Sequence, residues 1–168
     1  MEYSVLVFLH IGLGILWAGG AVVLGLFIIP AVLDAGPAGG AVMAGVTRRK
    51  LAPVMVAFGV IVVLTGLRLY MLRFSAGWLT SPAGIVISLG ALLGIGGLGI
   101  GMFVQKPLVE RIGKAAAGLA ASGAPPTPEQ AAEMHAMRGR LRSIARLTAL
   151  HLLGAALLMS LHRVAAGF

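Results

Sequence analysis

The stretch that decides the fold is Tyr3–Leu33, which reads YSVLVFLHIGLGILWAGGAVVLGLFIIPAVL. It contains no Asp, Glu, Lys or Arg. Because about 20 consecutive apolar residues suffice to cross a bilayer as a helix, this stretch predicts a membrane-spanning helix. Its single histidine, His10, costs free energy in that setting unless it faces a partner, and His10 is therefore a candidate functional residue.

The composition extends this prediction to the whole chain. The 168 residues are 59% hydrophobic and 11% charged, whereas soluble domains are about 25% charged. The absence of cysteine excludes disulfides, thiolate metal sites and iron–sulfur clusters. No cleavable signal peptide is expected, because the chain begins Met-Glu rather than with a basic region. The net charge of +8 does not indicate nucleic acid, since the cations flank apolar segments and suit topology and anionic lipid better.

Four apolar segments predict four spans, at about 3–33, 51–72, 83–104 and 147–161. The expected fold is an all-α integral membrane protein, an antiparallel bundle of four transmembrane helices that forms one domain over residues 1–168. The fourth segment is the shortest, and it spans the bilayer only if Arg146 and Arg163 extend their side chains to the two interfaces.

The connections between the spans differ in charge. The first and third, 34–50 and 105–146, carry ten cations: Arg48, Arg49, Lys50, Lys106, Arg111, Lys114, Arg138, Arg140, Arg142 and Arg146. The opposite side carries three: Arg68, Arg73 and Arg163. The positive-inside rule places the first and third connections in the cytoplasm and both termini on the periplasmic side of a bacterial inner membrane.

The third connection has two parts. Residues 115–127 are rich in Ala, Gly and Pro and predict a flexible linker. Thr127-Pro128-Glu129-Gln130 has the form of a capping box with proline at the first helical position. A cytoplasmic helical extension is therefore expected over about 128–146, continuing into the fourth span. His135 lies on this extension and is expected to be solvated.

The two histidines of the fourth segment are the natural partners of His10. At about 1.5 Å rise per residue, His10 and His162 both lie about 12 Å outward of their span centres, whereas His151 lies about 4 Å on the cytoplasmic side of the middle. His151 and His162 are eleven residues apart and so share one helix face, about 16 Å apart. A second cofactor at His151 would need Met55 or Met102 as its other ligand, although methionine in a span is usually packing material.

Arg68 lies at the same depth as His10 and His162, about 9 Å outward of the second span's centre. It has three candidate partners: lipid phosphate, Glu2, or an anionic ligand such as a haem propionate, for which Arg73 would be a second cation.

Simpler structural roles exist for the same residues. A satisfied interhelical hydrogen bond would explain His10 alone, and Trp17 is usually packing material, although its ring could wall a flat macrocycle. The glycine stripe Gly90, Gly94, Gly97 and Gly101 favours close helix packing. The dinucleotide-like motif at 94–99 lies inside an apolar span without a preceding strand, and is rejected. Because Asp34 is the only Asp, a Ser-His-Asp hydrolase is not supported.

The motif His10-x6-Trp17-x-Gly19-Gly20 resembles the first helix of copper-resistance-D-like membrane proteins and of the HemJ-type protoporphyrinogen oxidases. Arg49-x-Leu51-x-Pro53-x-Met55, Thr65-Gly66 and Gly77-Trp78-Leu79 echo the HemJ pattern. The resemblance covers the first half of the chain. It implies a four-helix membrane bundle in which the residue matching His10 binds b-type haem or a metal, near a quinone or porphyrinogen pool. The lysine that HemJ proteins carry early in the third span is absent from 80–90, which argues against protoporphyrinogen oxidation.

These observations predict a haem b protein that transfers electrons, as a small subunit of a redox complex. His10 and His162 are the expected axial ligands, with His151 as the substitute for His162, and Arg68 and Arg73 are expected to hold the propionates. A bis-histidine site leaves no open iron position, which favours electron transfer over catalysis at iron. Copper uptake or handling by the same histidines is the first alternative, and a cofactor-free assembly subunit is the second. Candidate partners are the bilayer, redox subunits, a quinone and a second copy of the chain.

Overall fold

The protein is all-helical over the residues that the structure describes. The computed structural model describes the backbone of residues 1–165 and the side chains of 1–36 and 38–162, so the predicted interfacial role of Arg163 lies outside the described side chains. The elements are α1 Glu2–Val23, the π-helical segment η1 Leu24–Ile28, α2 Ile29–Asp34, α3 Pro37–Arg48, α4 Leu51–Arg73, α5 Ala76–Leu79, α6 Pro82–Ile100, the π-helical segment η2 Gly101–Gln105, α7 Lys106–Ser122 and α8 Pro128–Ala165.

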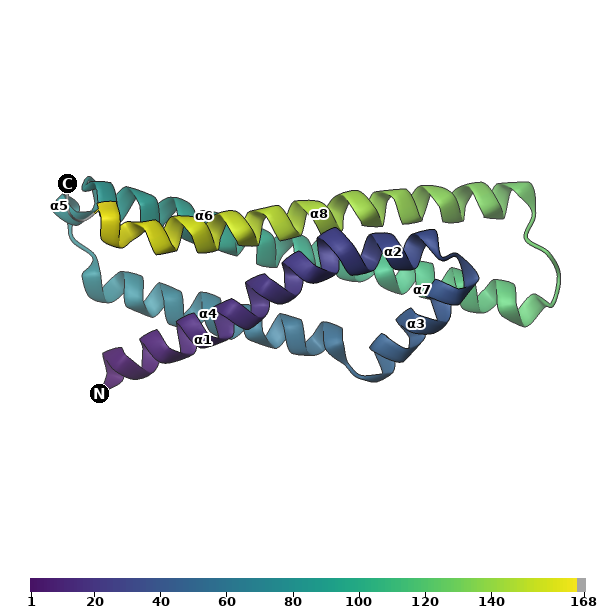
Figure 1. Ribbon diagram of the computed structural model, residues 1–168, viewed down its shortest axis with the longest axis horizontal. Coiled ribbons are helices and arrows are strands. Elements are labelled where there is room, and N and C mark those ends of the chain that lie inside the picture. The colour runs from purple at the N-terminus through teal and green to yellow at the C-terminus, as the bar shows by residue number, and fades with distance from the viewer. Residues whose placement is uncertain (166–168) are drawn as a thin grey trace.

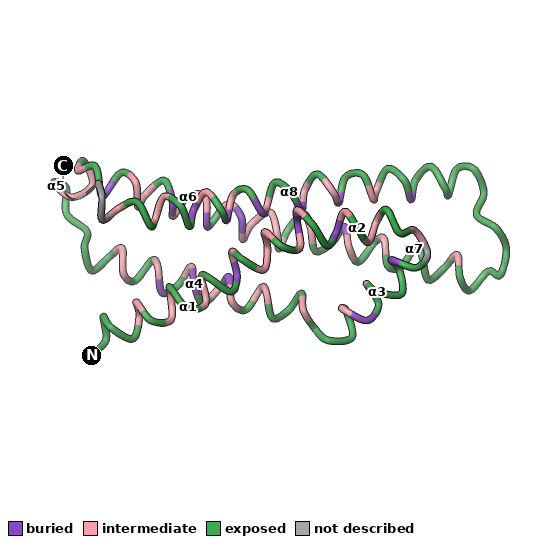
Figure 2. Tube along the Cα trace, viewed as in Figure 1, coloured by how far each residue is buried: buried purple, intermediate pink, exposed green. Residues whose placement is uncertain are grey.

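Four continuous helices are long and apolar enough to cross a membrane, as the hydropathy pattern predicts. They run over Glu2–Asp34, Leu51–Arg73, Pro82–Ser122 and Pro128–His162. Few of their large apolar side chains are buried, and many are exposed in the isolated chain (Figure 2). An apolar surface of this extent suits lipid rather than water.

The helices form two closely packed pairs, α1 with α4 and α6 with α8 (Figure 1). Glycines of α6 create the second interface. A Cβ added to Gly97 would lie 2.7 Å from Cδ2 of Leu152, and one added to Gly90 would lie 3.0 Å from Cγ of Met159. The predicted role of the glycine stripe in close packing is confirmed for Gly90 and Gly97, whereas a Cβ on Gly94 would make only an ordinary 3.9 Å contact with Ala155 and Gly101 has no neighbour within 4 Å.

The two pairs meet in one apolar cluster at the middle of the bundle. Trp17 of α1, Val62 of α4 and Leu152 of α8 are buried there, and Leu98 of α6 packs against them. A second buried cluster lies further along α8, where Leu141 and Ala145 contact Ile29 and Leu108. Gly25 lets the first helix approach α8 closely at this cluster, since a Cβ on it would lie 2.4 Å from the carbonyl oxygen of Ala145. We call this contact between the first helix and α8 the seam.

Each π-helical segment ends two residues before a proline. Pro30 and Pro107 have no N–H, and their rings would crowd the carbonyl four residues earlier in a regular helix. The residue before each proline bonds five residues back instead, Ile29 to the carbonyl of Leu24 and Lys106 to that of Gly101. The wider turn lets both helices continue past proline.

The flexible linker predicted over 115–127 is wrong for most of its length, because α7 continues through Ser122. Alanine is the strongest helix former, and the helix ends at Gly123, whose φ of 62° suits a glycine cap. The predicted start of the last helix is confirmed. Thr127 N–H donates to Oε1 of Gln130 at 2.9 Å, and Gln130 N–H donates to Oγ1 of Thr127 at 3.3 Å. The hairpin of α7 and α8 extends beyond the bundle (Figure 1).

Candidate functional site

His10 of α1 lies against α4 and is half-buried. Its Nδ1 lies within hydrogen-bonding distance of the carbonyl oxygen of Val62, at 2.9 Å, and Oγ1 of Thr65 lies 3.4 Å from the same nitrogen. Gly66 provides the space for the ring, because a Cβ there would lie 2.6 Å from Cε1 of His10. A histidine in an apolar helix is expected to have a polar partner, and for His10 that partner is a main-chain carbonyl across the α1–α4 interface.

Trp17 is 7% exposed and belongs to the central cluster. Its ring lies on Gly59, where an added Cβ would lie 2.7 Å from Cε2. The packing role that the sequence favours for Trp17 is the one observed. Met55 packs on α1 as well, since its Cε lies 3.0 Å from the position of a Cβ on Gly20.

The two histidines of α8 bond to their own helix. Nδ1 of His151 donates to the carbonyl of Leu147 at 2.9 Å, and Nδ1 of His162 donates to that of Met159 at 2.6 Å. The ring of His151 lies beside α6, with Cδ2 at 3.5 Å from the position of a Cβ on Gly96. Among the described side chains, no hydrogen bond involves the Nε2 atom of any of these three histidines.

The described contacts do not join His10 to either histidine of α8. In Figure 1 the first turns of α1 lie along α4 and apart from α8, which stays beside α6. No cluster of three or more His, Asp or Glu side chains in metal-binding proximity occurs in the described part of the chain. The common depth predicted for His10 and His162 is thus not accompanied by a direct contact.

The two arginines predicted near His10 have protein partners. Arg68 forms an ion pair with Oε1 of Glu2 at 2.8 Å, and both side chains are about half exposed, at 49% and 60%. This is one of the three partners that the sequence left open for Arg68. Arg73 donates to the hydroxyl of Tyr3 at 3.0 Å, and its guanidinium lies 6.0 Å from the centre of that ring. Both cations therefore tie the last turns of α4 to the first turn of α1.

The polar contacts that sequence reasoning missed lie between helices. Tyr70 and Ser88 link α4 to α6 at 2.7 Å, and Thr148 donates to Oε1 of Gln105 at 3.1 Å. Arg142 of α8 pairs with Asp34 at the end of α2. The two residues of each contact are far apart in the sequence, so residue spacing does not predict the contact. Asp34 alone offered a signal, because it is the only Asp in the chain.

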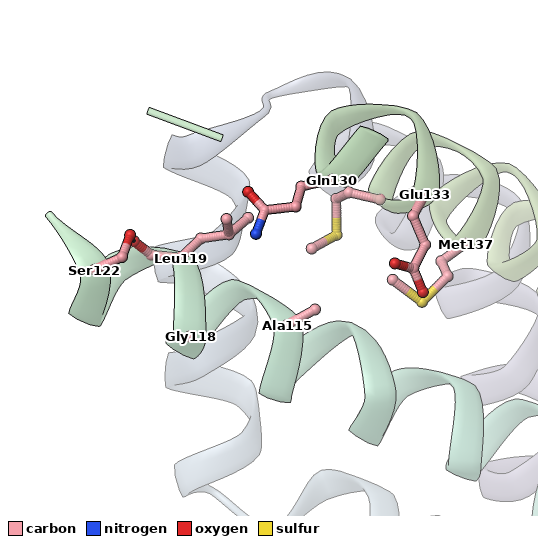
Figure 3. Close-up of a pocket in the computed structure, with 8 residues that line it drawn as sticks. Ala115, Gly118, Leu119, Ser122, Gln130, Glu133 and Met137 are labelled. Atoms are coloured by element: carbon pink, nitrogen blue, oxygen red, sulfur yellow. The ribbon is translucent and has the colours of Figure 1, made fainter. Parts of the chain in front are cut away.

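A groove of about 220 Å³ lies in the α7–α8 hairpin, and none of the three span histidines lines it (Figure 3). It is lined by four residues of α7 and four of α8: Ala115, Gly118, Leu119, Ser122, Gln130, Glu133, Met134 and Met137. None of the predicted site residues lines this groove.

Comparison of the chain with protein-family models, with curated protein sequences and with solved structures finds no match. The resemblance to copper-resistance-D-like and HemJ-type proteins therefore stays a prediction based on the first-helix motif. What can be assigned directly is an all-helical chain with four helices suited to a membrane.

Proposed function

We propose that this protein is an inner-membrane haem b protein that transfers electrons, with His10 as an axial ligand. One observation carries the proposal: the three span histidines each use Nδ1 on a main-chain carbonyl and keep Nε2 for another partner. Metal-ligating histidines commonly have this arrangement, because the Nδ1 hydrogen bond fixes the ring and the tautomer that leaves Nε2 basic. Two imidazole nitrogens, one from α1 and one from α8, would be the donor set for haem iron.

The proposed topology has antiparallel helices with both termini on the periplasmic side. The order of contacts between α1 and α8 supports it, since Trp17 packs near Leu152 whereas Gly25 packs near Ala145. The cations of α3, α7 and the first half of α8 would then face the cytoplasm. The C-terminal part of α8 would cross the bilayer, and 128–146 would extend from it.

His162 is the proposed second ligand. Measured from the Trp17–Leu152 contact, His10 is seven residues outward, about 10 Å, and His162 is ten residues outward, about 15 Å. Side chains lean toward the N-terminus of their own helix. In antiparallel helices this lean moves His10 outward and His162 inward, which reduces the offset. His151 lies about one residue from the contact and is the proposed substitute only if the helices shift.

Haem would supply a one-electron iron centre between the two helix pairs. His10 and His162 would bind the iron, and Arg68 and Arg73 would neutralise the propionates after exchanging Glu2 and Tyr3 as partners. Two histidine ligands leave no open position for oxygen, which suits electron transfer. A quinone or another redox subunit is the proposed partner.

The absorption spectrum of the full-length protein, purified in mild detergent from haem-replete cells, tests the proposal. We expect a Soret band that sharpens and shifts on reduction, and that is lost in both His10→Ala and His162→Ala. The matched control is His135→Ala, which removes an exposed histidine from the hairpin and should leave the band unchanged.

Three results would contradict the proposal in different ways. A colourless protein with stoichiometric copper would favour the copper-handling alternative. A protein with neither chromophore nor metal that co-purifies with membrane subunits would favour an assembly role. Loss of the band in His151→Ala but not in His162→Ala would identify His151 as the second ligand instead of His162, and the assignment of His10 would stand.

A further inference from the structure

The environment of Nδ1 in His10 contains acceptors but no free donor. The carbonyl of Val62 can only accept, and it lies 2.9 Å from Nδ1. The hydroxyl of Thr65 donates its single proton to the carbonyl of Ile61 at 2.7 Å, with the carbonyl of Val62 at 3.1 Å as the other acceptor. The Thr65 oxygen, 3.4 Å from Nδ1, therefore presents lone pairs to it.

Gly66 determines whether the ring can occupy this place. A Cβ at position 66 would lie 2.6 Å from Cε1 and 3.0 Å from Nδ1 of His10. The obstructed group would be the end of a flexible side chain, so the ring could rotate away while the helices stayed packed. Rotation would break the hydrogen bond to Val62 and open Nδ1 to other partners.

We propose that α4 holds His10 in the Nδ1–H tautomer, with Gly66 as the positioning residue that presents Nε2 as a lone-pair donor. The tautomer assignment stands on the α1–α4 contacts alone. Its consequence for redox chemistry rests on the proposed function. His10 differs here from His151 and His162, whose Nδ1 atoms bond to their own helix and would keep those bonds if the helices moved.

A metal ion bound at Nε2 would be affected by this hydrogen bond. Donation from Nδ1–H to a carbonyl raises the basicity of the ligating nitrogen, and a more basic ligand stabilises oxidised iron. The α1–α4 contact would thereby lower the midpoint potential of a haem on His10. Loss of the contact would raise that potential.

The direct test is nitrogen NMR of the cofactor-free, full-length protein in lipid nanodiscs, with ¹⁵N-labelled histidine and resonances assigned by single His→Gln variants. We expect one tautomer at His10, with the proton on Nδ1. A proton predominantly on Nε2 would overturn the inference.

Two variants and one control test the positioning. Gly66→Ala should give a mixture of tautomers at His10, whereas Gly96→Ala should leave the spectrum of His151 unchanged, because its Cβ would make only an ordinary 3.5 Å contact with that ring. Thr65→Val should retain the Nδ1–H tautomer, since it removes no donor facing Nδ1. Retention of a single tautomer in Gly66→Ala, or its loss in Thr65→Val, would contradict the proposed arrangement.

A redox titration separates this inference from the proposed function. If the protein binds haem, Gly66→Ala should raise the midpoint potential, and Gly96→Ala should not. Absence of haem would remove the proposed function while the NMR result still decides the tautomer. Haem binding with an unchanged potential in Gly66→Ala would contradict the inferred effect on the ligand alone.

Discussion

The two helix pairs use glycine for different purposes. In α6 and α8, Gly90 and Gly97 admit the flexible aliphatic side chains of Met159 and Leu152. In α1 and α4, Gly59 and Gly66 admit the rings of Trp17 and His10. Aliphatic contacts provide packing without direction, whereas the ring of His10 is oriented by a hydrogen bond to Val62. A glycine opposite a polar ring can therefore position a site, whereas a glycine opposite leucine only allows two helices to pack closely.

The largest effect is expected at the seam that joins the pairs, in Gly25→Ala. The new Cβ would lie 2.4 Å from the carbonyl oxygen of Ala145 and 2.9 Å from Cβ of Ala149. Neither group can rotate away, so η1 and α8 must separate. We expect destabilisation at or above the upper end of the usual overpacking cost of about 1–3 kcal/mol, measured by reversible unfolding in mixed detergent micelles.

The control for the seam is Gly19→Ala, which lies on the same helix and has nothing within 4 Å of the added Cβ. It should be neutral, or stabilising by up to about 1 kcal/mol through helix propensity. Equal destabilisation by both variants would mean that the α1–α8 seam does not join the pairs as described.

The second effect compares the pairs directly. Gly59→Ala would bring a Cβ to 2.7 Å from the ring of Trp17 and 2.8 Å from Cδ1 of Leu98, and should cost about 1–3 kcal/mol. Gly94→Ala should cost nothing, because its Cβ would lie 3.9 Å from that of Ala155. Unfolding measurements in a Trp78→Phe background would also report a shift in Trp17 emission for Gly59→Ala alone. A larger loss of stability in Gly94→Ala than in Gly59→Ala would contradict this prediction.

Sequence reasoning predicted the four long helices because each contains an uninterrupted apolar run. It also predicted the start of α8, since the capping box is local chemistry between Thr127 and Gln130. It missed the helix over 115–122, where alanine propensity outweighed glycine, and the short helix α3 in the first connection. The π-helical turns before Pro30 and Pro107 depend on how each helix accommodates the missing N–H, which residue spacing does not reveal.

The candidate site was less predictable than the fold. A lone histidine in an apolar helix requires a partner, and that requirement identified His10. Its observed partner is the carbonyl of Val62, and a main-chain group is present at every position, so no residue type marks it. Side-chain partners are easier to foresee, and Glu2 was among those expected for Arg68.

A smaller effect is expected at the link between α4 and α6. Ser88 donates to the carbonyl of Gly84 at 2.7 Å, so Tyr70 donates its hydroxyl proton to Ser88. Tyr70→Phe removes that hydrogen bond and retains the edge-on contact with Trp78, whose ring centre is 5.1 Å away. Hydrogen bonds between membrane helices average about 0.6 kcal/mol, and we expect a loss of that size in the unfolding assay. Ser88→Ala should give a similar loss, and a much larger loss in Tyr70→Phe would indicate that the hydroxyl has another role.

The smallest effect on stability is expected for Glu2→Gln, which breaks the ion pair with Arg68 between the ends of α1 and α4. Both side chains are about half exposed, and exposed ion pairs contribute about 0–1 kcal/mol and weaken with salt. The variant is more informative about ligand binding than about folding. Glu2 competes with any anion for Arg68, so Glu2→Gln should tighten haem binding if Arg68 holds a propionate, and Arg68→Gln should weaken it. Haem titration of the two variants at equal ionic strength measures both changes, and unchanged affinity in both would leave Arg68 as a structural link between α1 and α4.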